Sequence, residues 1–169
     1  LYGILNGTCN YVLTSMTRSN ADFQTVLSRA QEKGYAEADP TLDINGTDTA
    51  HKLAILGSIA FGGRIGMDDI YIEGIENIEP EDIRNACEMG YVIKLLAIGR
   101  RSPDGSISLR VHPSLVNQNA PLARVEGPFN AVSVFGSAVG NTMFYGRGAG
   151  MMATASAQPV TTASQPSTV

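Results

Sequence analysis

The sequence contains no tryptophan and only two cysteines, Cys9 and Cys87, which lie far apart along the chain. No C-x-x-C pair or cluster of histidine and cysteine indicates zinc, and we expect no metal ion. The two thiols are expected to be reduced and buried. The sequence leaves open a disulfide bond between them, although nothing else in it suggests secretion. No apolar run approaches the roughly 20 residues that cross a bilayer, so we expect no membrane partner.

Positive charge is also scarce. The chain has 12 lysines and arginines against 16 acids, a net charge of −4, and its nearest approach to a basic stripe is the pair Arg100-Arg101. A nucleic-acid-binding surface needs a concentrated basic patch, so we expect no nucleic-acid partner. The opening Leu1-Tyr2-Gly3-Ile4 has the form of neither a signal peptide nor a transit peptide. We therefore expect a cytoplasmic protein, and a piece of a longer chain because the sequence begins within an apolar phrase.

The chain is long and apolar enough for one domain, with 169 residues of which 43% are hydrophobic. Helical spacing predicts three helices in the first part. The first covers residues 8–16 with Thr8 or Asn10 as its cap, and the second follows Asn20 or Asp22 and ends at Gly34. A polar loop is expected over residues 35–46. The third helix begins at Thr47 and ends at 62–63, and its expected buried residues are Ala50, Leu53, Ala54, Leu56, Ile59 and Ala60.

Strand patterns dominate the second part. Short strands are predicted over residues 70–75, 91–98, 107–111, 131–135 and 142–145, with a turn at 102–105 and a helix from Pro80 to about Gly90. Helices followed by hairpin-linked strands predict an α+β fold, with helices packed on one face of a mixed, largely antiparallel sheet. Gly146 to Gly150 is interpreted as a turn, because a phosphate-binding loop would follow a strand near the start of a domain.

The most informative segment runs from Glu37 to Lys52 and gathers ionisable groups just ahead of an apolar helix. Asp48 and Lys52 are four apart on the predicted third helix and therefore share a face. A surface pair of this kind is common and contributes only about 0.3–0.5 kcal/mol. The functional alternative is a lysine that exchanges a proton with a substrate hydroxyl, its pKa lowered by burial and raised by nearby acids. Carboxylates of this segment that do not pair with the lysine would suit a substrate that carries an ammonium group.

Four sequence motifs occur in order along the chain: Gly3-Ile4-Leu5-Asn6-Gly7-Thr8-Cys9-Asn10-Tyr11, Gly34-Tyr35-Ala36-Glu37-Ala38-Asp39-Pro40, Asp43-Ile44-Asn45-Gly46-Thr47-Asp48-Thr49-Ala50-His51-Lys52-Leu53 and Phe144-Tyr145-Gly146-Arg147-Gly148-Ala149-Gly150. Together these motifs closely resemble homoserine dehydrogenase. The similarity covers residues 1–157, which correspond to the family's substrate-binding, catalytic and dimerisation domain. Residues 158–169 are expected to form a polar, disordered tail in place of the family's return helix, which Gln158-Pro159 would interrupt.

The resemblance implies an oxidoreductase that interconverts L-homoserine and L-aspartate 4-semialdehyde with NADP or NAD, on the route to threonine, methionine and isoleucine. Carried over by motif, Lys52 is the proton donor or acceptor, and Asp48 is its partner and a further substrate-site residue. Glu37 is a substrate ligand, and Asp43 is expected to assist it. Thr8 would lie near the substrate.

The resemblance also implies cofactor contacts and a partner chain. Gly34 and Gly150 match glycines whose backbone approaches the cofactor, where a Cβ would obstruct it. The dinucleotide fingerprint G-x-G-x-x-G is absent from the start of this sequence, so we expect the main cofactor-binding domain to lie elsewhere and this chain alone to be inactive. The family implies a homodimer formed through the sheet, unless the helices cover that face.

Two other interpretations stay open. The chain could be a non-catalytic dimerisation or interaction module derived from this domain, as the missing fingerprint and the unusual tail suggest. The presence of Glu37, Asp48 and Lys52 speaks against that interpretation, because a scaffold has no need of them. A weaker possibility is a related dehydrogenase that acts on another semialdehyde or amino acid.

Overall fold

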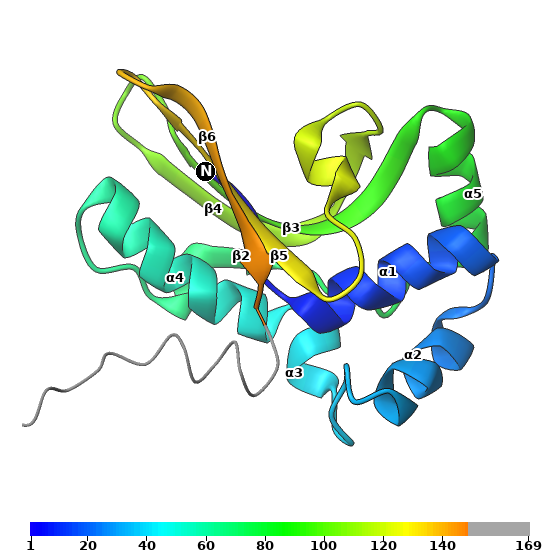
Figure 1. The fold of residues 1–169 in the computed structure, drawn as a ribbon. Coiled ribbons are helices and arrows are strands. Elements are labelled where there is room, and N and C mark those ends of the chain that lie inside the picture. The colour runs from blue at the N-terminus through cyan, green and yellow to red at the C-terminus, as the bar shows by residue number, and fades with distance from the viewer. Residues whose placement is uncertain (149–169) are drawn as a thin grey trace, which may run out of the picture.

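A computed structural model describes residues 1–148 of the chain. Its helices and strands form two layers, with the helices beneath one face of a twisted sheet (Figure 1). The helical elements are α1 (Gly7–Ser19), α2 (Phe23–Glu32), α3 (Thr41–Ile44), α4 (Thr47–Phe61), α5 (Pro80–Glu88) and the 3-10 turns η1 (Met67–Asp69) and η2 (Pro121–Arg124). None of these described helices is both long and apolar enough to span a membrane.

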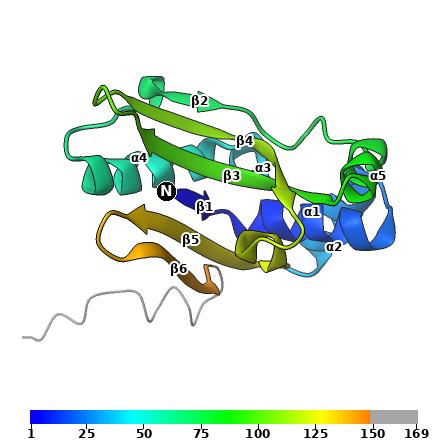
Figure 2. The same ribbon diagram turned by 90° about the horizontal axis from the view of Figure 1, so that it is seen from above.

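The sheet has six strands in the order β2-β4-β3-β1-β5-β6, which Figure 2 shows from above. Its strands are β1 (Tyr2–Ile4), β2 (Ile70–Ile72), β3 (Tyr91–Arg101), β4 (Ile107–Asn117), β5 (Phe129–Gly136) and β6 (Gly140–Arg147). The pair β2–β4 is parallel and every other pair is antiparallel. The predicted α+β fold with a mixed, largely antiparallel sheet is therefore confirmed.

The strand β1 was not predicted, although it lies between β3 and β5 near the middle of the sheet. It has three residues, one of which is glycine, and so offers no alternation for a pattern to detect. The strands β3 to β6 are all longer than predicted, most of all β4, which continues to Asn117, whereas β2 ends three residues early at Ile72. The expected turn at 146–150 is wrong at its start, since Gly146 and Arg147 pair with β5 as part of β6.

Helix α1 begins one residue earlier than predicted, and neither Thr8 nor Asn10 is its cap. Asn6 is the N-cap, and its side chain accepts a hydrogen bond from the backbone N–H of Cys9. Asn10 instead points its amide toward the carbonyl of Val125, 3.0 Å away. The buried side of α1 packs against the sheet and includes Cys9, Val12, Leu13 and Met16. The chain thus turns from β1 directly into a helix at Asn6.

The boundaries of α2 and α4 agree with the sequence analysis. Asp22 caps α2, Gly34 follows α2 with a φ of 71°, and α4 runs from Thr47 to the glycines at 62–63. The expected buried face of α4 is wrong at its end, because Ala60 is exposed and Ile59 is 77% exposed. In the last turn of α4, Ile59 and Ala60 therefore face away from the core, whereas Phe61 packs against it. The expected polar loop at 35–46 also contains the short helix α3.

The two faces of the sheet carry separate apolar cores. The larger core lies between the sheet and the helices and includes Leu13, Leu53, Leu95 and Val111. The smaller core lies on the opposite face, where the segment around η2 covers part of the sheet. Its buried residues are Ile4, Leu96, Ile98, Val116, Ala123, Val125 and Ala131. Strand β3 serves both cores, since its alternate side chains point to opposite faces.

Candidate functional site

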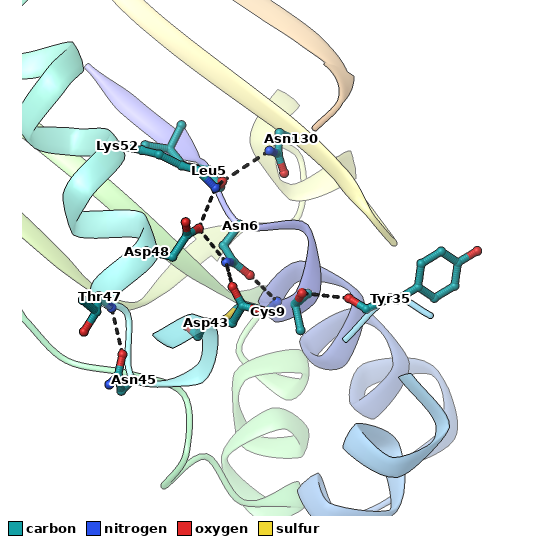
Figure 3. Close-up of polar contacts among 11 residues, drawn as sticks. Leu5, Asn6, Cys9, Tyr35, Asp43, Asn45, Thr47, Asp48, Lys52 and Asn130 are labelled. Carbon is teal, nitrogen blue, oxygen red and sulfur yellow. Dashed lines mark hydrogen bonds and ion pairs between the residues drawn. The ribbon is translucent and has the colours of Figure 1, made fainter. Parts of the chain in front are cut away.

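A cleft of about 300 Å³ opens where the N-terminus of α1, the start of α4, the loop after α2 and strand β5 meet. Its lining includes most of the residues singled out by the sequence analysis, namely Thr8, Gly34, Glu37, Asp43, Asp48 and Lys52. Figure 3 shows Asp43, Asp48 and Lys52 turned toward one another across this region. The acidic loop after α2 and the start of α4 thus meet at one cleft. Larger cavities lie elsewhere on the protein, but none of them gathers these groups.

Lys52 and Asp48 form an ion pair on one face of α4, with Nζ 2.5 Å from Oδ2. Lys52 Nζ also donates to the carbonyl oxygen of Leu5, 3.2 Å away at the end of β1. The side chains of Lys52 and Asp48 are 48% and 31% exposed, so water weakens the attraction between them. Such a pair adds little to folding stability, and its position in the cleft is the stronger reason for its presence. An ammonium with two acceptors retains one proton that can point into the cleft.

Asn6 lines this cleft and is one of the residues that the sequence analysis did not assign to the site. Its amide nitrogen donates to Asp43 Oδ1 at 2.6 Å and to Asp48 Oδ2 at 2.9 Å. Its amide oxygen accepts from the N–H of Cys9 at 2.8 Å, and the residue is only 5% exposed. The available signal was its place in the Asn-Gly-Thr phrase ahead of a helix, which indicates a cap but not the bridge to two acids.

Asp43 is held from two sides. Its carboxylate meets Asn6, and its backbone carbonyl accepts from the thiol of Cys9, with a distance of 3.1 Å between Sγ and O. Burial, followed by the nearby Asp43 and Asp48, raises the pKa of the Cys9 thiol. A thiol of this kind is not nucleophilic, because the thiolate is the reactive form. Cys9 is buried and Cys87 is only half-buried, so the expectation of two buried thiols is correct for Cys9 and wrong for Cys87, and both thiols are free.

Glu37 and Asp39 differ, although both belong to the acidic loop. Glu37 lines the cleft, and no hydrogen bond or ion pair joins its carboxylate to another group in residues 1–148. Asp39 instead accepts from the N–H and hydroxyl of Thr41, which lower the pKa of its carboxyl. Asp39 does not line the cleft and serves the local turn into α3. Glu37 is thus the acid available to a ligand.

The N-terminus of α1 faces the same cleft. The hydroxyl of Thr8 donates to the carbonyl of Tyr35 at 2.8 Å and so ties the helix to the loop after α2. Asn6 caps the N–H of Cys9, whereas the N–H groups of Gly7 and Thr8 have no acceptor among the described residues. Free N–H groups at the start of a helix favour an anion. The cleft therefore offers carboxylates on one side and a weakly positive helix end on the other.

Two more residues close the cleft on the side of the sheet. The amide nitrogen of Asn130 donates to the carbonyl of Leu5 at 3.3 Å, and its buried amide oxygen has no partner among the described residues. Gly148 lies against Asn130 so closely that a Cβ at this position would collide with the amide. A side chain at position 148 would therefore require the Asn130 amide to move. The neighbouring Arg147 lies over the ring of Phe129, with 5.1 Å from Cζ to the ring centroid.

Of the two glycines expected to approach a cofactor, Gly34 lines the cleft and Gly150 lies outside the described residues. A Cβ at Gly34 would meet nothing within 4 Å, so its positive φ, rather than crowding in this chain, favours glycine there. Its contact with a cofactor stays a prediction. Among residues 1–148 no group of three or more histidine, cysteine or acidic side chains is placed to hold a metal ion.

The chain is similar to known proteins over most of its length. A family model described as homoserine dehydrogenase matches residues 1–158. A homoserine dehydrogenase of Synechocystis is 52% identical over 160 residues, which cover 93% of this chain and 37% of that protein. One of Helicobacter pylori is also 52% identical, over 92% of this chain and 37% of that protein. The chain thus spans little more than a third of the length of these relatives.

Solved structures agree in fold. The crystal structure of a homoserine dehydrogenase from Thiobacillus denitrificans superposes with a TM-score of 0.89 at 52% identity, over 92% of this chain and 36% of that one. A mutant of a hyperthermophilic archaeal homoserine dehydrogenase, solved in complex with NADPH, gives a TM-score of 0.72 at 28% identity. That match covers 92% of this chain and 43% of the archaeal one.

Proposed function

The chain belongs to the homoserine dehydrogenase family, and we propose that it is the substrate-binding and catalytic part of an NAD(P)-dependent enzyme that interconverts L-homoserine and L-aspartate 4-semialdehyde. The observation that carries the proposal is the position of Lys52, which points into a cleft beside Asp48 and the carbonyl of Leu5. The activity is proposed for the complete polypeptide that contains these residues. Threonine, methionine and isoleucine synthesis would use its product, and we place it in the cytoplasm, where nicotinamide cofactors and these amino acids are available.

Lys52 is the proton-transfer group in this proposal. In homoserine oxidation, neutral Lys52 Nζ accepts the proton of the substrate hydroxyl while the carbon that carries the hydroxyl loses a hydride. In aldehyde reduction, protonated Lys52 donates that proton to the aldehyde oxygen as negative charge develops there. When bound, NAD or NADP supplies the hydride acceptor or donor. Asp48 holds Nζ in place, so that the proton is exchanged at one fixed point of the cleft.

The charges of the cleft fit a small amino acid. Glu37, Asp43 and Asp48 present carboxylates that suit the ammonium group of the substrate. The free N–H groups at the start of α1, together with Thr8, suit its carboxylate. The side-chain hydroxyl of homoserine would then reach toward Lys52. This distribution favours an amino-acid substrate over one that carries only a carboxylate.

The rim of the cleft fits a nicotinamide ring. Gly34 leaves space on one side because no Cβ occupies it, and Gly148 lies against the Asn130 amide on another side. These glycines, with Gly150, would let the ring approach the substrate. The described residues contain no dinucleotide-binding loop, so the remainder of NAD or NADP needs a second unit of the complete polypeptide.

A homodimer is part of the proposal, and a specific observation favours it. The strand register places Tyr71, Phe135 and Tyr145 on the sheet face opposite the helices, and these three side chains are 57%, 78% and 57% exposed. Large aromatic side chains exposed on one face of a sheet are common at interfaces, and these three extend from one edge strand, β2, to the other, β6. A second copy packed on this face would bury them. The alternative of a purely structural dimerisation module rests on the same face and does not need the cleft.

Binding and turnover separate the two functions. We expect isothermal calorimetry to detect L-homoserine binding to this chain, while homoserine-dependent NAD(P)H formation is expected only from the complete polypeptide. Sedimentation of the chain should show a dimer under either interpretation. A complete polypeptide that binds no homoserine and forms no NAD(P)H, but still dimerises, would establish the scaffold instead. Robust turnover by residues 1–169 alone would contradict the need for a second cofactor-binding unit.

A further inference from the structure

Asn6 occupies the junction between the sheet and the helices, where β1 ends and α1 begins. All of its side-chain hydrogen-bonding atoms are used. The oxygen accepts from the N–H of Cys9, and the nitrogen donates to Asp43 and Asp48. With only 5% of the residue exposed, water has little access to compete for these bonds. The amide is therefore held in a single orientation, which Figure 3 shows between the two acids.

Two carboxylates that contact the same nitrogen atom lie close enough to repel each other. A neutral NH₂ group supplies one N–H to each and so holds the pair without adding charge. Serine or threonine has one proton to donate, and aspartate has none when it is ionised. Asparagine alone among the common helix caps combines an acceptor for the helix N–H with two donors for the acids.

The contacts of Asn6 extend to Lys52, the proposed proton-transfer group, through one oxygen atom of Asp48. Asp48 Oδ2 accepts from Asn6 at 2.9 Å and from Lys52 Nζ at 2.5 Å. The Asp48 carboxylate is thus held by the buried amide of Asn6, and the same oxygen pairs with Lys52, whose side chain is about half exposed. Without the amide, Lys52 would be the only remaining hydrogen-bond partner of the Asp48 carboxylate among the described residues, and the pair would no longer be anchored to the junction of β1 and α1. Leu5, the residue before Asn6, supplies the other acceptor of Lys52.

We propose that Asn6 is a positioning residue for the proton transfer, which bridges Asp43 and Asp48 and thereby sets where Lys52 Nζ stands and how readily it releases its proton. This inference rests on the proposed function, because it assigns Asn6 a part in the reaction of the same cleft. The role is separate from the helix cap. The cap requires only the amide oxygen, whereas the positioning requires only the amide nitrogen.

Two variants separate these roles. Asn6→Ser keeps an acceptor for the helix but loses the double donor, and we expect kcat to fall by about 10- to 100-fold as Lys52 is misplaced. Asn6→Asp is also a good cap, but it adds a third carboxylate. Because added negative charge favours the ammonium form of Lys52, we expect the pH profile of kcat for homoserine oxidation to move upward by about one unit. Each variant retains a helix cap, but the loss of the amide donors between two acids costs stability, so kcat is compared per folded enzyme at a temperature below both melting transitions.

Asn45→Ser is the matched control. Asn45 likewise accepts a backbone N–H at a helix start, from Thr47 at 2.9 Å, but it does not contact Asp43 or Asp48 through its side chain. The same substitution there should leave both kcat and its pH profile unchanged. The measurements are made on the complete polypeptide with L-homoserine and NAD(P). The inference is overturned if Asn6→Ser and Asn6→Asp keep the parent pH profile and kcat, or if they lose activity only in proportion to the fraction unfolded.

Failure of the proposed function would look different. In that case the parent polypeptide itself would form no NAD(P)H from homoserine, whatever residue stands at position 6. An active parent enzyme with indifferent position-6 variants leaves the function intact and removes the inference alone.

Discussion

Lys52 and Lys94 each donate hydrogen bonds to the first part of the chain, Lys52 to Leu5 between β1 and α1 and Lys94 to Asn10 within α1, but their surroundings differ. Lys52 donates to Leu5 and Asp48 and is about half exposed at the cleft. Lys94 is 3% exposed, donates to Asn10 Oδ1 at 3.0 Å and to the carbonyl of Val125 at 2.6 Å, and pairs with no carboxylate among the described residues. Burial lowers the pKa of Lys94 to about 8.

The difference shows that a perturbed pKa is not enough to identify a reactive group. Lys94 has the lowered pKa that a base needs, but its nitrogen is sealed between α1 and the segment around η2. The side chain of Lys52 is accessible from the cleft that it lines, and it has a carboxylate partner. Access to substrate and fixed geometry come first for a general base, and pKa comes second. We therefore assign chemistry to Lys52 and a structural tie to Lys94.

The largest expected effect is at Lys52. Lys52→Arg keeps the positive charge and the partner Asp48, but a guanidinium does not give up its proton at the pH of the assay. We expect kcat of the complete polypeptide to fall by about 10²- to 10⁴-fold in both Lys52→Arg and Lys52→Ala, with the melting temperature nearly unchanged. Near-normal turnover by either variant would remove Lys52 from its role and leave the two lysines without a functional difference.

Lys94 should respond in stability instead of activity. Lys94→Met has a similar shape and leaves Asn10 Oδ1 without its donor, whereas Val125 still accepts from the Asn10 amide. We expect the free energy of unfolding, measured by urea denaturation, to fall by about 1–3 kcal/mol because a buried acceptor is left unpartnered. The kcat of the folded fraction should stay at the parent level. A loss of turnover without a loss of stability would place Lys94 in the chemistry and break the comparison.

The same variant reports on the buried ammonium. The pKa of Lys94 in the folded chain is about 8, below the ordinary value of 10.5, so the unfolded chain binds more protons between these limits. The destabilising contribution of the buried charge is full below pH 8 and disappears as the pH rises toward 10.5. Relative to Lys94→Met, the parent should therefore gain stability over this window, by at most about 1.4 kcal/mol per pH unit. A constant difference would contradict the lowered pKa.

The smallest expected effect separates the two loop acids. Glu37→Gln removes a carboxylate that is free to meet the substrate ammonium, and we expect KM for homoserine to rise by about tenfold or more. Asp39→Asn is the matched control, because Asp39 serves the turn at Thr41 and lies outside the cleft. Steady-state kinetics at one pH suffices. An equal rise of KM in both variants would mean that the loop acts through its general charge.

The contents of the cleft could be predicted from the sequence where they depend on local spacing. Asp48 and Lys52 share a face of α4 because they lie one turn apart, and Gly62 ends the helix with a φ of 73°. The exposure of Ile59 could not be predicted, because a helical stripe does not show where the facing sheet ends. Strand β1 was not predicted because three residues are too few to show the alternation of apolar and polar side chains that marks a strand.

By itself the sequence determined the helix that carries Asp48 and Lys52, the acidic loop before it and the family to which the chain belongs. Only the tertiary structure decided which groups surround that lysine. Asn6 meets Asp48 across 42 positions of the chain, and Asn130 meets Leu5 across 125. Contacts of this kind depend on how β1, β5 and α1 pack together. A local sequence pattern does not predict them, because a hydrogen bond needs its two partners close in space and not close in sequence.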